Sequence, residues 1–241
     1  MAGGCDVIIL CGGLGTRLRA VLDDRPKPMA PIDGRPFLDL IVEHVTAYGF
    51  HRFIFCTGHM GEWIANHFGD RTEITAVICR EGKPLGTGGA LKACRHLITS
   101  STVLILNGDS LCQIDLKAFL AEHRRRKAWA TVAVVPSDDR TDGGGITLNS
   151  EGRIVAFHEK GPGSFLNAGI YALESRVFEH IPDRIPCSLE QEVFPRLLER
   201  PIYAVLCEAP LHDIGTPARL EEFRTWNRTG CEPKVGKETV C

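Results

Sequence analysis

Glycines and cationic side chains stand close together near the start of the chain, in the segment LCGGLGTRL. The glycines are Gly12, Gly13 and Gly15. They follow an apolar run that predicts a buried strand over Asp6–Cys11. A loop at the carboxyl end of a parallel strand lies where open sheets bind ligands, and glycine lets backbone N–H groups approach phosphate oxygens. Arg17 and Lys27 add fixed positive charge, which suits a nucleoside triphosphate.

The better-known glycine signatures are absent from this segment. GxGxxG would need another spacing, and a Walker loop would need GK[ST] after its second glycine. A tight turn that binds no ligand is the alternative interpretation. The nearby Arg17 and the rigid Pro26-Lys27-Pro28 segment favour a phosphate site instead.

Two aspartates follow apolar runs further along the chain. Asp109 stands in NGD, directly after TVLIL, and Asp213 stands in HDIGTP. Carboxylates at strand ends are suitable ligands for a hard cation. Considered singly, each motif is more typical of a turn or a helix start than of a metal site.

Strands and helices must position these groups. The pattern of apolar residues in the first two thirds of the chain predicts that strands and helices alternate there. Short apolar runs alternate with 10–15-residue helical patterns, which indicates βαβ units and a mainly parallel sheet. After Pro136 the runs Gly145–Asn149 and Arg153–His158 predict a hairpin. A strand over Asn167–Leu173 and a helix over Leu189–Leu198 follow.

We therefore expect an α/β fold: a three-layer α/β/α sandwich with a Rossmann-like, mainly parallel mixed sheet. Residues 1–227 are predicted to form one domain, with a first part over 1–136 and a more antiparallel second part over 137–227. A strand over Ile202–Cys207 and a helix over Pro217–Trp226 close that domain. Residues 228–241 are predicted to form a loose tail.

Composition excludes several classes of protein. The chain has 241 residues, a net charge of −2 and 44% hydrophobic residues, so no global field attracts nucleic acid or an anionic membrane. Ten cysteines show no zinc spacing, and those in apolar runs, such as Cys56, Cys79 and Cys207, are typical of core positions. No signal peptide or membrane-spanning stretch is visible, so we expect a cytoplasmic protein. A homodimer is left open.

These motifs resemble the sugar-1-phosphate nucleotidyltransferase family, whose signature is GG-x-GTRL followed by PKPM-x-PI. The resemblance extends to about Phe223. It implies that residues 1–136 form the nucleotide-binding part of the domain and residues 137–227 the sugar-binding part. It implies that Arg17 and Lys27 are catalytic, and that Asp109 and Asp213 bind Mg²⁺. The nucleotide-binding residues that it implies are Leu10, Gly12, Gly13, Gly15, Thr16, Glu81, Thr87, Gly88, Asn107 and Gly108.

The loop PLGTGGA resembles the guanylyltransferase branch. A guanine edge presents N–H donors, so we expect Glu81 to accept them; a solvated loop carboxylate is the alternative. Three glycines in four positions, 86, 88 and 89, indicate close backbone approach.

The acceptor site is implied by FHEK and NAGIY. By resemblance, Glu159 binds sugar hydroxyls, Lys160 binds the sugar phosphate, and Asn167 and the Gly145 backbone contact the sugar. Gly161 replaces the proline of the family's F-x-EKP motif, and Gly144 replaces an aromatic residue.

The expected partners are GTP and a sugar 1-phosphate. The motifs look most like the branch that acts on D-glycero-α-D-manno-heptose 1-phosphate for bacterial surface polysaccharides, with mannose 1-phosphate guanylyltransferases as the runner-up. A non-catalytic nucleotide-sugar sensor is the alternative from another class, and retention of the cations and aspartates argues against it.

Overall fold

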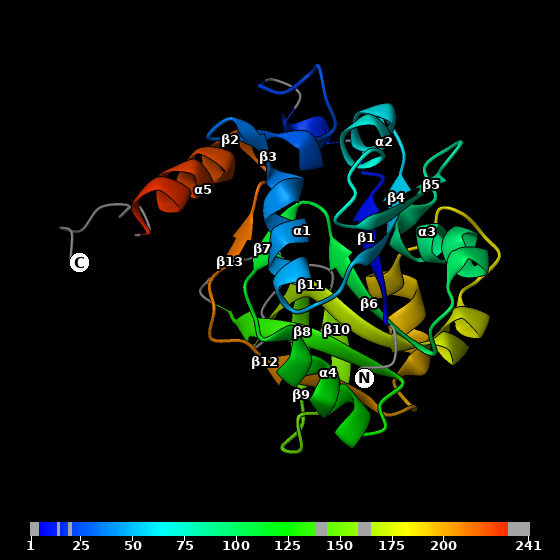
Figure 1. Ribbon diagram of the computed structural model, residues 1–241. Helices are drawn as coiled ribbons and strands as arrows, with labels where there is room; N and C mark the ends of the chain where they lie inside the picture. Colours follow the sequence, from blue (N-terminus) through cyan, green and yellow to red (C-terminus); the bar gives the residue numbers. More distant parts are fainter. Residues whose placement is uncertain (1–4, 14, 19–20, 138–143, 159–164, 231–241) are drawn as a thin grey trace.

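The computed structural model describes residues 5–13, 15–18, 21–137, 144–158 and 165–230 (Figure 1). In this part of the chain the main sheet has nine strands: β1 (Asp6–Cys11), β4 (Arg52–Thr57), β5 (Thr75–Arg80), β6 (Thr102–Asn107), β8 (Ala130–Pro136), β9 (Gly145–Leu148), β10 (Ile154–His158), β11 (Phe165–Glu174) and β12 (Ile202–Leu206). Five α-helices accompany them there: α1 (Phe37–Ala47), α2 (Glu62–Phe68), α3 (Gly86–Cys94), α4 (Leu116–Arg125) and α5 (Pro217–Thr229).

The sheet order places β1 at a topological switch point. The strands run β10-β9-β11-β6-β1-β4-β5, and β8 joins β11 to β12. β1 pairs in parallel with both β4 and β6, so the chain moves outward to one side of β1 and later to the other. β11 is antiparallel to β6 and β8. Ligands of open sheets bind beside such a switch point, at the carboxyl ends of the strands.

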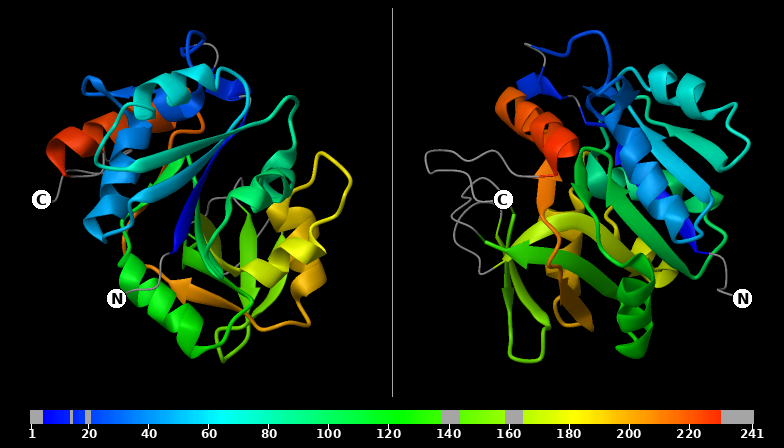
Figure 2. Two further views of the ribbon diagram at one scale, coloured as in Figure 1. Left: turned by 45° about the vertical axis from the view of Figure 1, so that its right-hand side comes forward. Right: turned by 60° about the vertical axis from the view of Figure 1, so that its left-hand side comes forward.

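Helical layers cover both faces of the sheet. Val7 and Ile9 of β1 are buried in one core, together with residues of α1, α2, α4 and α5. Ile8 faces the other core, which α3 and residues 177–197 cover. In Figure 2, α3 lies beside the yellow-to-orange segment that follows β11. The expected α/β/α sandwich with a mixed, mainly parallel sheet is confirmed.

The helix expected over Leu189–Leu198 is not a regular α-helix. A π-helical turn covers Leu189–Val193 and a 3₁₀ turn covers Phe194–Leu197. The Val193 N–H donates to the Ser188 carbonyl at 3.3 Å, one residue further back than in an α-helix. Pro195 has no N–H to continue a regular ladder.

Helix ends also differ from the sequence prediction. α3 begins at Gly86, three residues before the expected start at Gly89, so the glycines of PLGTGGA lie in its first turn. α5 begins with Pro217 after the Thr216 cap and continues to Thr229, where Gly230 at φ 68° ends it. Residues 231–241 of the expected tail lie outside the described residues.

Two short two-stranded sheets were not predicted from the sequence. β2 (Pro31–Ile32) pairs with β3 (Arg35–Pro36), and β7 (Ser110–Cys112) pairs with β13 (Leu211–Asp213). Strands of two or three residues carry too few positions for an alternation to be visible. The β7–β13 pair matters most here, because it joins the two segments that carry Asp109 and Asp213.

The cysteines that the structure describes are core residues, as the apolar runs predicted. Eight are buried and form no disulfide: Cys5, Cys11, Cys56, Cys79, Cys94, Cys112, Cys187 and Cys207. Within the described ranges, none of the helices combines the length and apolar character that crossing a bilayer requires.

Candidate active site

The loops after β1 and β6 pack directly against each other. The Gly108 N–H donates to the Leu10 carbonyl at 2.9 Å. A Cβ at Gly108 would stand 2.9 Å from Cys11 Sγ and 3.0 Å from the Leu10 oxygen, so only glycine allows this contact. The glycine of NGD is thus explained by loop packing, and it holds Asn107 and Asp109 beside the first glycine loop.

A cavity of about 330 Å³ opens at these strand ends. Its described lining consists of Leu10, Gly12, Gly13, Glu81, Pro84, Leu85, Gly86, Thr87, Ala90, Asn107, Asp109 and Pro186. Seven of these are among the residues expected to bind the nucleotide or metal. We call this space the nucleotide cavity.

Other expected nucleotide residues lie beside this cavity rather than in its lining. Gly15 lines a separate small hollow together with Lys27, and Thr16 is exposed in a 3₁₀ turn. The Gly88 N–H donates to the Cys187 carbonyl at 2.9 Å, and a Cβ at Gly88 would stand 3.1 Å from Cys187 Sγ. The close approach predicted for this loop is therefore made, in part, to the chain around Cys187.

Glu81 lies half-buried in the nucleotide cavity. A Cβ at Gly12 would stand 2.6 Å from Glu81 Oε1, so the glycine loop rests against this carboxylate. The Leu85 N–H donates to Glu81 Oε2 at 3.3 Å. Burial raises the pKa of Glu81, and the bond from Leu85 only partly opposes that shift. A carboxylate with spare acceptor positions is thus present where a base could dock.

Cations and carboxylates meet at one point beside the cavity. Lys27 Nζ donates to Asp109 Oδ2 at 2.6 Å. A Cβ on Gly215 would stand 3.6 Å from both Lys27 Nζ and an Arg17 guanidinium nitrogen, and 2.7 Å from Asp213 Oδ1. The four charged residues of the sequence prediction are therefore brought together around a glycine, although their positions span almost 200 residues.

The β7–β13 pair brings the two aspartates close. Asp213 pairs in register with Ser110, and the Ile214 N–H donates to the Asp109 carbonyl at 3.0 Å. Asp213 Oδ1 accepts from the Gly215 N–H at 2.9 Å and from Arg219 at 3.1 Å. The Asp109 side chain is 42% exposed and that of Asp213 is 24% exposed, so both have surface for a ligand.

This donor set fits Mg²⁺ held jointly by protein and substrate. Within the described residues, no group of three or more His, Cys, Asp or Glu side chains could hold a metal ion alone. Mg²⁺ keeps several waters and is usually bound through one or two carboxylates plus substrate phosphates. Asp109 and Asp213 supply that number of carboxylates.

A second cavity, of about 480 Å³, lies on the other side of Asn107. Its described lining consists of Asn107, Gly144, Gly145, Ile146, Phe157, His158, Asn167, Tyr171, Ser188, Glu190, Gln191 and Pro195. It contains two of the four residues expected to bind the sugar phosphate, Gly145 and Asn167. The other two, Glu159 and Lys160, lie outside the described residues. We call this space the acceptor cavity.

A bulge in β11 shapes the acceptor cavity. Gly169 has φ 74°, and the β11–β8 register shifts between Asn167 and Tyr171. A Cβ at Gly169 would stand 2.7 Å from Ser110 Oγ and 2.8 Å from Asn107 Nδ2. Asn167 Oδ1 accepts from the Gly169 N–H at 2.9 Å, and its Nδ2 donates to the Tyr171 hydroxyl at 2.9 Å. The glycine of NAGIY is therefore required by both backbone conformation and space.

Sequence reasoning gave no role to five polar residues that line this cavity: His158, Tyr171, Ser188, Glu190 and Gln191. Tyr171 stands in NAGIY, where it could have been noticed as a polar side chain two residues after the bulge. Glu190 gave no signal, because CSLEQEVFP is typical of an amphipathic helix and carries no ligand motif. The Tyr171 hydroxyl donates to the Glu190 carboxylate at 2.8 Å.

Comparisons with known proteins show which family this chain belongs to. The nucleotidyl transferase family profile matches residues 6–226. A D-glycero-alpha-D-manno-heptose 1-phosphate guanylyltransferase of Aneurinibacillus thermoaerophilus is 37% identical over 216 residues, which cover 88% of this chain and 94% of that protein. A mannose-1-phosphate guanylyltransferase of Mycobacterium tuberculosis is 36% identical over 198 residues, which cover 80% of this chain but only 55% of that protein.

Two solved structures are similar to this chain in both fold and sequence. HddC from Yersinia pseudotuberculosis is 30% identical, with a TM-score of 0.82, and the match covers 92% of this chain and 98% of that one. HddC complexed with GMP-PN matches with a TM-score of 0.79, covering 90% of this chain and 96% of that one. The profile match over nearly the whole chain, together with the glycine loop, cations and carboxylates gathered at the β1–β6 switch point, shows that this protein is an enzyme of the nucleotidyl transferase family.

Proposed function

We propose that this protein transfers GMP from GTP to D-glycero-α-D-manno-heptose 1-phosphate, releasing pyrophosphate, with Mg²⁺ as cofactor and bacterial surface polysaccharides as the destination of the product. The observation that carries the proposal is the pair of cavities that share Asn107 beside the cluster of Lys27, Asp109 and Asp213. We choose the heptose as acceptor because the Aneurinibacillus relative is named for it, and the match covers 88% of this chain and 94% of that protein.

The reaction needs no covalent enzyme intermediate. A phosphate oxygen of the sugar 1-phosphate attacks the α-phosphorus of GTP in line. The bond between this phosphorus and the oxygen that bridges the α- and β-phosphates breaks, and pyrophosphate leaves. Because both reactants are anions, the protein must bring them together and stabilise the charge that develops. In this proposal Lys27 and Arg17 bind the phosphates, and Asp109 and Asp213 would hold Mg²⁺, which neutralises phosphate charge when bound.

Guanine recognition is assigned to Glu81. Its carboxylate can accept from the N1–H and N2–H₂ groups of guanine, and its half-buried position in the nucleotide cavity, which raises the pKa of Glu81, supports this assignment. Hydrogen bonds to a charged group contribute about 1.5–3 kcal/mol. We expect Glu81→Gln to lower kcat/KM for GTP by about 10- to 100-fold and to leave KM for the sugar 1-phosphate unchanged.

One panel tests the proposal: four nucleoside triphosphates crossed with heptose, mannose and glucose 1-phosphates, with and without Mg²⁺, read by pyrophosphate release. GTP with the heptose should give the highest kcat/KM, and omission of Mg²⁺ should abolish turnover. A preference for UTP or dTTP would contradict the Glu81 assignment. No release with any pair would favour a non-catalytic nucleotide-sugar sensor.

Mannose 1-phosphate is the second candidate acceptor. The Mycobacterium relative is almost as similar in the matched region as the heptose relative is. A higher kcat/KM for mannose 1-phosphate in the same panel would select this alternative.

A further inference from the structure

Glu190 is held in one position by three hydroxyl donors. Thr87 Oγ1 donates to Glu190 Oε2 at 2.8 Å, and Ser188 Oγ donates to the same oxygen at 3.0 Å. The Tyr171 hydroxyl donates to Glu190 Oε1 at 2.8 Å. The donors come from α3, from β11 and from the turn before residue 189, so the carboxylate is fixed from three directions.

These donors depend on Glu190 in turn. Tyr171 is fully buried, and burial together with the neighbouring Glu190 raises the pKa of its phenol far above the usual value. The Thr87 hydroxyl is occupied as well, because it accepts from the Leu189 N–H at 2.8 Å. Turning Glu190 away would leave the proton of the buried Tyr171 hydroxyl without its acceptor, which costs more than the hydrogen bond itself contributes.

Glu190 also gives the described lining of the acceptor cavity its negative charge. Among the described residues that line this cavity, it is the one Asp, Glu, Lys or Arg. A carboxylate has about four lone-pair sites, and the three donors occupy three of them. One acceptor position on Oε1 is left for a ligand.

Building on the proposed function, we propose that Glu190 is a specificity-determining residue of the acceptor cavity. It accepts a hydrogen bond from a hydroxyl of a neutral sugar 1-phosphate and rejects sugar 1-phosphates that carry a carboxylate on the ring. The selected substrate class is neutral polyhydroxylated sugars, and the rejected class is uronic acid 1-phosphates.

The rejection follows from fixed charge. Because Glu190 is anchored on three sides, it cannot turn away from an incoming carboxylate. A ring carboxylate bound in a cavity of about 480 Å³ would lie close to this fixed charge, and like charges repel. Selection therefore does not depend on which ring hydroxyl donates to Glu190.

The test compares two acceptors that differ only at C6, mannose 1-phosphate and mannuronic acid 1-phosphate, each with GTP and Mg²⁺. We expect the wild-type protein to favour the neutral acceptor by at least 100-fold in kcat/KM. In Glu190→Gln this ratio should fall at least 10-fold, because the amide keeps the shape and one acceptor oxygen but loses the charge. KM for GTP should change less than 3-fold.

Glu192→Gln is the matched control. Glu192 lies two residues further along the same turn and is not among the lining residues; it pairs with Arg184 and accepts from the Ser188 N–H at 3.2 Å. This variant should keep the wild-type ratio. Thermal unfolding of both variants shows whether the fold is retained.

The outcomes are separable. A wild type that turns over no sugar 1-phosphate defeats the proposed function, and this proposal falls with it. An active wild type whose preference survives in Glu190→Gln, or disappears equally in Glu192→Gln, overturns the role of Glu190 alone. Faster turnover of mannuronic acid 1-phosphate by Glu190→Gln than by wild type is a gain that a merely structural role would not produce.

Discussion

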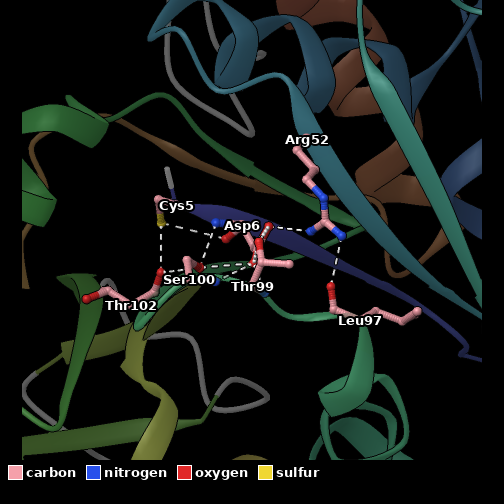
Figure 3. Close-up of polar contacts among 7 residues, drawn as sticks. All are labelled: Cys5, Asp6, Arg52, Leu97, Thr99, Ser100 and Thr102. Carbon is pink, nitrogen blue, oxygen red and sulfur yellow. Dashed lines mark hydrogen bonds and ion pairs between the residues drawn. The ribbon is translucent and has the colours of Figure 1, made fainter. Parts of the chain in front are cut away.

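A buried carboxylate at the amino end of β1 holds the sheet together at the side opposite the active site. Asp6 is 2% exposed and accepts from the backbone N–H groups of Thr99 at 2.6 Å and Ser100 at 2.9 Å. It also pairs with Arg52 of β4, and Arg52 donates to the Leu97 carbonyl at 2.9 Å (Figure 3). One side chain thus joins β1, β4 and the segment that leads into β6.

Replacing Asp6 with alanine should destabilise the protein by about 3 kcal/mol. Breaking a buried ion pair by removing one partner costs about 3–5 kcal/mol, and an unpaired buried N–H costs about 1–3 kcal/mol. The lower end applies here because the Arg52 side chain is 33% exposed and can turn to water. For a chain of this size the melting temperature should fall by roughly 6–12 °C. Asp6→Asn keeps an acceptor for the N–H groups and should cost less.

The same carboxylate makes stability depend on pH. Burial alone would raise the pKa of Asp6, but the hydrogen bonds from Thr99 and Ser100 and the charge of Arg52 together lower it. A group with a lowered folded pKa contributes stability above its unfolded pKa of about 3.9, and that contribution is lost as pH falls through the folded pKa. The stability gap between wild type and Asp6→Asn should therefore be largest from about pH 5 upward and shrink below pH 4.

Urea unfolding of wild type, Asp6→Ala and Asp6→Asn at pH 7, 5, 4 and 3 measures both effects. Asp24→Ala is the control: Asp24 is exposed and pairs with its neighbour Arg25, so its loss should leave unfolding unchanged. The reasoning is refuted if Asp6→Ala unfolds within 1 kcal/mol of wild type at pH 7. It is also refuted if the Asp6→Asn gap stays constant down to pH 3.

Three further predictions concern the active site. Lys27→Ala and Asp109→Ala should each lower kcat at least 100-fold, with the melting temperature within about 3 °C of wild type; unchanged kcat in both would reject the site. Gly169→Ala should raise KM for the sugar 1-phosphate and lower stability by about 1–3 kcal/mol, because the new methyl group meets Ser110 at a positive φ; a neutral result in both assays would contradict the bulge argument. Burial raises the pKa of Glu81, so its carboxylate should take up a proton at a pH above the ordinary glutamate range. As pH is lowered, KM for GTP should therefore begin to rise at that higher pH in the wild type and should show no such rise in Glu81→Gln. The same pH profile in both proteins would exclude Glu81 as the titrating group.

The sequence predicted the centre of the site because strand ends are local features. An apolar run followed by glycines or by NGD identifies a strand and its carboxyl end without tertiary information. Parallel strands place those ends on one edge of the sheet, so Gly12, Asn107 and Asp109 had to lie close together. Their meeting at one cavity confirms that reasoning.

The rest depends on pairings that sequence patterns do not encode. Asp213 reaches Asp109 through β13, a strand of three residues that pairs with β7 about 100 positions earlier. Gly86, at φ 75°, makes its closest approach to the Cys187 carbonyl, and that partner is invisible in PLGTGGA. Glu190 belongs to an irregular π-helical turn and meets Thr87 across 103 positions. Each case needs the fold before the contact can be inferred.

Ion pairs balance the charges of the cluster in the free protein. Asp109 is paired with Lys27, and Asp213 with Arg219, so neither carboxylate is left without a counter-charge before substrate arrives. A triphosphate bound with Mg²⁺ would give Lys27 phosphate oxygens and give the carboxylates a divalent ion. Lys27 would then exchange one anionic partner, the Asp109 carboxylate, for another and would be paired in both states. On this argument Asp109→Asn, which weakens the partner of Lys27 in the free protein, should impair catalysis far more than it lowers stability.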